Sequence, residues 1–63
     1  MQNELARLKL SLAVLRMGLN GFIDSQDADD IATALEVGMP IDWDKYPPST
    51  EEAVRPIIER TQP

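Results

Sequence analysis

The chain has 63 residues, a formal net charge of -5, and neither cysteine nor histidine. These values limit it to one small domain and exclude both a disulfide framework and a zinc site built from cysteine and histidine. Because a domain of this size is marginally stable, we expect tight helix packing or oligomerisation to reinforce it.

The composition also argues against several function classes. A chain without histidine and cysteine lacks the usual general base and the common soft metal ligands. We therefore predict that it is not an enzyme, and we assign no catalytic, cofactor-binding or metal-ligating residues. A membrane span needs about 20 consecutive apolar residues, and an acidic surface repels phosphate backbones. We expect a cytoplasmic protein that binds neither a membrane nor nucleic acid directly.

The first predicted helix covers residues 3–20, which are rich in strong helix formers. Its apolar residues form two seams on roughly opposite sides. The leucine seam has the three-and-four spacing of heptad positions a and d and contains Leu5, Leu8, Leu12, Leu15, Leu19 and Phe22. The second seam contains Leu10, Val14 and Met17, together with Ala6 and Ala13.

Two apolar seams are more than so short a chain is expected to cover. Leaving Leu10, Val14 and Met17 in water would sacrifice about 5–9 kcal/mol, which is comparable with the whole stability of a small domain. We therefore predict a homodimer that associates through the second seam, as an antiparallel or crossed pair of first helices. A different protein is the alternative occupant. Periodicity alone does not decide which seam faces the core.

A second helix is predicted over residues 25–37. Asp24 or Ser25 fits its N-cap, and Gly38 fits the left-handed residue that ends it. The short connection between the two helices predicts an antiparallel hairpin. Asp24, Asp27 and Asp30 form a candidate acidic face, interpreted either as a solvated surface or as a mimic of nucleic-acid phosphates.

Residues 38–48 are predicted to form a loop, because three prolines exclude regular structure there. Trp43 and Tyr46 are interpreted either as a lid over the open end of the hairpin or as anchors of a partner-binding loop. A third helix is predicted over residues 50–60, with Ser49 as its N-cap and a kink or break at Pro56.

The sequence thus predicts one all-α domain of three helices over residues 1–63. Its expected function is a non-catalytic adaptor, regulator or inhibitor that acts through protein–protein contacts, by analogy with small acidic modulators encoded by phages and plasmids. The first alternative is a nucleic-acid mimic that blocks the basic groove of a nucleic-acid-binding protein. A structural assembly subunit of a larger particle is a further alternative.

Overall fold

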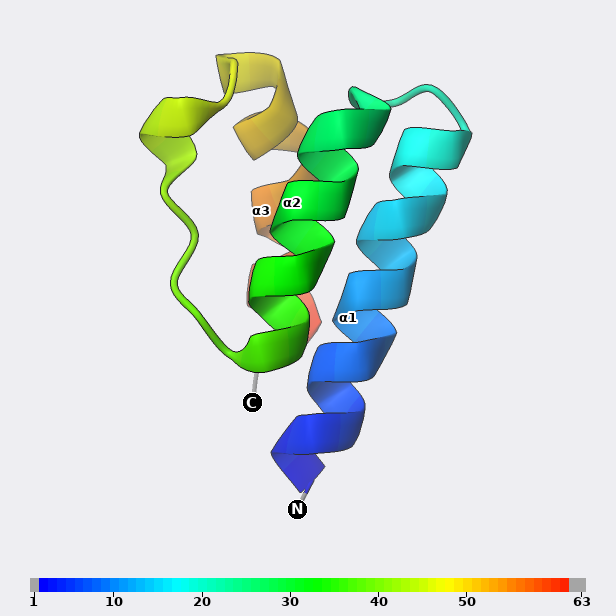
Figure 1. The fold of residues 1–63 in the computed structure, drawn as a ribbon, viewed down its shortest axis with the longest axis vertical. Coiled ribbons are helices and arrows are strands. Elements are labelled where there is room, and N and C mark those ends of the chain that lie inside the picture. The colour runs from blue at the N-terminus through cyan, green and yellow to red at the C-terminus, as the bar shows by residue number, and fades with distance from the viewer. Residues whose placement is uncertain (1, 62–63) are drawn as a thin grey trace.

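The computed structural model describes the backbone of residues 2–61 and the side chains of residues 4–60. Three α-helices, α1 (Gln2–Leu19), α2 (Ser25–Val37) and α3 (Pro48–Thr61), and a short 3₁₀ helix, η1 (Trp43–Lys45), follow one another. The described residues contain no strand, so the predicted all-α class with three helices is confirmed. α1 and α2 lie side by side in opposite directions, α3 lies behind them, and residues 38–47 return along the far side of α2 (Figure 1).

The turn between α1 and α2 uses glycine at the position where the chain needs a positive φ. Gly21 has φ 85°, and its N–H donates to the carbonyl of Gly18 over 3.2 Å. The N–H of Phe22 donates to the carbonyl of Met17 over 3.0 Å. This pair of bonds is the Schellman arrangement that ends many helices. After this turn, Ile23 lies in the core with 8% of its surface exposed, whereas Phe22 is 70% exposed.

Replacing Gly21 with alanine isolates the effect of that backbone conformation. No atom lies within 4 Å of an added Cβ at Gly21, so the substitution meets no steric obstacle. We expect Gly21→Ala to lower the free energy of unfolding by about 1 kcal/mol, because a left-handed φ is strained for alanine. Urea denaturation measures the change. Gly21→Asn is the control and should be less destabilising, since asparagine tolerates this region better.

α2 carries clear signals at both ends. Oδ1 of Asp24 accepts a hydrogen bond of 2.8 Å from the N–H of Gln26, which makes Asp24 the N-cap. Gly38 has φ 81°, and its N–H and that of Met39 donate to the last turn of α2. Nε of Arg7 donates over 3.4 Å to the carbonyl of Glu36. A cation from α1 therefore occupies the negative end of the α2 dipole, where α2 has no basic residue of its own.

The third helix differs from its prediction at both Ser49 and Pro56. α3 begins at Pro48, where the missing proline N–H would have had no helical partner, and Ser49 lies inside the first turn instead of capping it. The carbonyl of Pro47 accepts from the N–H of Thr50 over 3.0 Å. Helical structure continues through Pro56 to Thr61, so the predicted alternative of a break is wrong, whereas the alternative of a kink stays a prediction.

The core lies where α1, α2 and α3 meet. Val14, Ile31 and Val54, one from each helix, are completely buried. The remaining buried apolar residues are Leu10, Ile23, Ala28, Ala32 and Leu35.

The position of Leu10 and Val14 corrects the predicted dimer interface. Both were assigned to a surface shared with another chain, but their exposures are 5% and 0% within this single chain. α2 and α3 together cover the side of α1 that carries the second seam, so the assignment of Leu10 and Val14 to an intermolecular interface is wrong. The other three members, Met17, Ala6 and Ala13, are half-buried.

Candidate protein interaction surface

The leucine seam lies on the surface of the domain. Leu5, Leu12 and Leu19 have exposures of 58%, 55% and 84%. Leu8 is 42% exposed and Leu15 is half-buried. These five leucines form an apolar stripe along α1, because residues three and four apart are neighbours on a helix, and Phe22, 70% exposed, follows in the turn after the helix. Scattered apolar residues are ordinary on a protein surface, whereas a row of neighbouring exposed apolar side chains is typical of interaction surfaces.

One long edge of this stripe is formed by α2. Leu15 and Leu19 share a shallow hollow with Ala28 and Asp29 of α2. Glu36 lies two turns after Asp29, and its carbonyl accepts the bond from Arg7 of α1. Both acidic residues are exposed. The edge of the stripe next to α2 therefore carries two exposed carboxylates and one half-buried cation, Arg7, and is acidic on balance.

The opposite edge of the stripe is basic. Lys9 and Arg16 follow the heptad positions of Leu8 and Leu15 by one residue, which places them on the side of the leucine seam away from α2. Both are exposed, and among the described residues the side chains of Lys9 and Arg16 form no hydrogen bond or ion pair within the chain. The surface thus consists of an apolar centre with a basic edge and an acidic edge.

The aromatic residues of the loop serve the chain's own core. Trp43 and Tyr46 are half-buried and pack against the hydrophobic cluster. Trp43 lines a hollow between the loop and α3 that also includes Leu35 and Ile58. Most of the apolar surface that made these residues candidate binding anchors is therefore turned inward.

The three residues of the predicted acidic face do not share one role. Asp24 caps α2, whereas Asp27 and Asp30 lie one turn apart on the side of α2 that faces the loop. Burial raises the pKa of the Tyr46 hydroxyl, and the negative charges of Asp30, Asp27 and Asp42 raise it further. The three carboxylates therefore lie near one tyrosine, and the hollow lined by Asp30, Asp42 and Tyr46 contains no residue of the leucine seam.

Tyr46 gives the domain a dependence on alkaline pH. Its pKa in the folded state is raised above the ordinary value, so the unfolded chain loses this proton first as pH rises. The contribution to stability is complete below about pH 10 and is lost as pH rises through the folded pKa. We expect Tyr46→Phe to reduce the loss of stability above that pH in urea denaturation. The chain has a single tyrosine, so its ultraviolet titration reports this residue alone.

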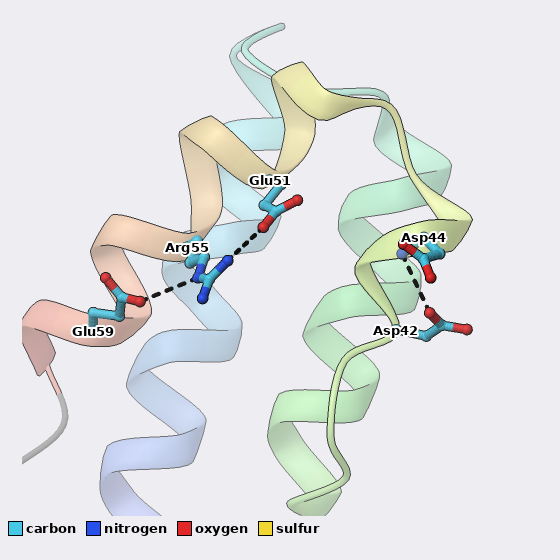
Figure 2. Close-up of polar contacts among 5 residues, drawn as sticks. All are labelled: Asp42, Asp44, Glu51, Arg55 and Glu59. Atoms are coloured by element: carbon cyan, nitrogen blue, oxygen red, sulfur yellow. Dashed lines mark hydrogen bonds and ion pairs between the residues drawn. The ribbon is translucent and has the colours of Figure 1, made fainter.

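Charged side chains on α3 are paired with one another. Figure 2 shows Arg55 between Glu51 and Glu59, with Nη1 2.6 Å from a Glu51 oxygen and Nε 3.1 Å from a Glu59 oxygen. These hydrogen bonds raise the pKa of Arg55. Figure 2 also shows Oδ1 of Asp42 accepting a bond of 3.2 Å from the N–H of Asp44, which caps η1. Both sets of bonds stabilise local structure.

The described residues contain neither a metal-binding cluster nor a helix that could span a membrane. Among residues 4–60, no group of three or more acidic side chains is arranged to hold a metal ion. None of the helices in the part of the chain described is long and apolar enough to cross a membrane. The chain matches no protein-family model, no curated protein and no solved structure.

Two features of this surface were not identified from the sequence. Periodicity did not decide which seam of α1 faces the core, so the exposure of Leu5, Leu8, Leu12 and Leu19 was not predicted. The contact of Arg7 with the end of α2 joins residues 29 positions apart. The basic Lys9 and Arg16 beside the seam were visible signals, since charged residues flanking positions a and d accompany helix pairing between chains.

Proposed function

We propose that this chain is a non-catalytic protein–protein interaction module that self-associates through the leucine seam of α1. The observation that carries the proposal is the exposure of that seam, which reaches 84% at Leu19 and 70% at Phe22. Burying the exposed parts of its five most accessible members would contribute about 5–9 kcal/mol per chain. This amount is comparable with the stability of a whole small domain.

The proposal predicts concentration-dependent association that depends on the seam. In sedimentation equilibrium at micromolar concentrations, we expect the wild-type chain to form dimers. Leu12→Glu should weaken dimerisation more than about a hundredfold, because a two-fold interface buries the introduced charge twice. Circular dichroism should show unchanged helical content, since Leu12 is 55% exposed and lies outside the core.

Val37→Glu is the matched control for that variant. Val37 is 59% exposed and lies at the end of α2, away from the leucine seam. Its replacement should leave the dimer affinity unchanged. A wild-type chain that remains monomeric at all concentrations would contradict self-association, and growth beyond the dimer would favour an assembly subunit.

A second candidate function follows from the carboxylates around Tyr46. Asp27, Asp30 and Asp42 lie close enough together to raise one pKa, so they present concentrated negative charge on a face separate from the leucine seam. This arrangement suits a mimic of nucleic-acid phosphates that occupies a basic groove. Mimicry predicts binding to a nucleic-acid-binding protein that weakens steeply with salt and is lost in the Asp27→Asn, Asp30→Asn double variant.

A further inference from the structure

We propose that the partner on the leucine seam is a second copy of this chain in parallel orientation, with the two α1 helices side by side and in register. This inference rests on the proposed self-association and specifies its geometry. Three features support it. They are the heptad spacing of the seam, the opposite charges of its two edges, and the matching positions of the charged residues of α1 and α2 along the helix axes.

The spacing of the seam suits another helix of the same kind. Leu5, Leu12 and Leu19 occupy heptad position a, and Leu8 and Leu15 occupy position d. In a parallel pair of such helices, each a or d residue packs against its counterpart in the second helix. The seam is therefore complementary to itself.

The charges on the two edges distinguish parallel from antiparallel pairing. Two copies placed face to face by a two-fold axis along α1 bring the basic edge of one copy against the acidic α2 edge of the other. A two-fold axis perpendicular to α1 makes the helices antiparallel and brings basic against basic and acidic against acidic. Juxtaposed like charges disfavour the antiparallel pair, and complementary charges favour the parallel one.

The charged residues also lie at matching levels. Lys9 and Arg16 are seven residues apart on α1, and Asp29 and Glu36 are seven apart on α2, so each pair is separated by about 10 Å along its helix. The hollow shared by Leu15 and Asp29 places Asp29 near the level of Arg16. The bond from Arg7 to the carbonyl of Glu36 places Glu36 near the level of Lys9.

A parallel dimer in register therefore forms two kinds of ion pair between α1 and α2, each occurring twice. Arg16 lies opposite Asp29 of the second copy, and Lys9 lies opposite Glu36 of the second copy. Glu4 adds to the same preference, because it precedes Leu5 at position g and faces Lys9 of the second copy at position e. Lys9 and Arg16 are thus the residues that determine the direction of pairing.

Single-cysteine variants test the orientation directly, because the natural chain has no cysteine. Under mild oxidation, a parallel dimer in register should link Leu5→Cys to itself, since the two copies of position 5 meet. An equimolar mixture of Leu5→Cys and Leu19→Cys should give the two homodimers and little mixed product. Val37→Cys, exposed but outside the seam, is the control and should not form a linked dimer at the same concentration.

Charge exchange tests the ion pairs independently. Arg16→Asp and Asp29→Arg should each weaken dimerisation about tenfold, because each change places like charges together at two symmetric sites. The double variant restores opposite charges and should return the dissociation constant to within a few-fold of wild type. The weakening by either single variant should decrease at high salt.

The outcomes separate this inference from the proposed function. A dimer that yields only the mixed product of Leu5→Cys and Leu19→Cys is antiparallel; it overturns the parallel arrangement but leaves self-association intact. A dimer whose affinity is unaffected by Arg16→Asp and Asp29→Arg overturns the role of the charged edges. A monomeric wild-type chain overturns both proposals. A different protein would then be the remaining candidate partner for the leucine seam.

Discussion

Val14→Asp is expected to unfold the chain. Val14 is completely buried where α1 meets α2 and α3, and no cationic side chain belongs to the hydrophobic cluster around it. An ionised carboxylate in such a site costs several kcal/mol more than in water, which approaches or exceeds the total stability of a domain of this size. Circular dichroism should show the loss of most helical signal at neutral pH.

Leu12→Asp is the matched variant on the other side of the same helix. It introduces the same side chain two residues away, at a position 55% exposed to solvent. Measured at a concentration below the dissociation constant of the dimer, its helical content and unfolding midpoint should stay close to those of the wild type. If Leu12→Asp unfolded the chain and Val14→Asp did not, α1 would present the opposite face to the core.

Gly18→Ala is expected to produce the second large effect, through steric overlap between α1 and α2. A Cβ added at Gly18 would lie 2.6 Å from the Cβ of Ala28, a side chain that is 1% exposed and has no room to move aside. Alanine is favoured over glycine inside a helix by about 1 kcal/mol. Overpacking typically costs about 1–3 kcal/mol, so we expect net destabilisation, measured as a lower urea midpoint with an unchanged slope.

A compensating change distinguishes overlap from other causes. Ala28→Gly removes the methyl group that Gly18→Ala would meet, so the double variant should be more stable than the sum of the two single changes predicts. We expect a favourable coupling of about 1–2 kcal/mol in the double-mutant cycle. Strictly additive effects would show that the two helices separate freely at this point.

Much of the helical framework was predictable because its signals are local. Asp24 caps α2 through its own next turn, and Gly38 ends α2 through its own φ of 81°. The predicted range of 25–37 and the observed α2 have the same bounds. Gly21 likewise supplies the left-handed residue after α1. Such interactions involve residues a few positions apart, so they can be recognised directly from the sequence.

The prediction of the third helix shows where local signals compete. Ser49 and Glu52 have the spacing of a capping box, yet the chain starts α3 one residue before Ser49, at Pro48. Pro56 has a strong tendency to break a helix, but Val54 and the partly buried Ile57 and Ile58 pack against the core on either side of it. The packing of these side chains against the core outweighs the local cost of a proline inside the helix. The packing partners come from other elements, so the residues next to Pro56 in the sequence do not indicate it.

The sequence by itself determined that α1 carries two apolar seams and that a short connection joins α1 and α2 into a hairpin. Only the tertiary structure decided which seam is buried. Rotating α1 about its own axis preserves every local hydrogen bond, so helix propensity and periodicity are equally satisfied by either choice. Shape is consistent with the choice: Gly18 allows α1 to approach Ala28 of α2 closely, and the side of α1 that includes this contact also carries Leu10 and Val14. The leucine seam is left outside for the same reason.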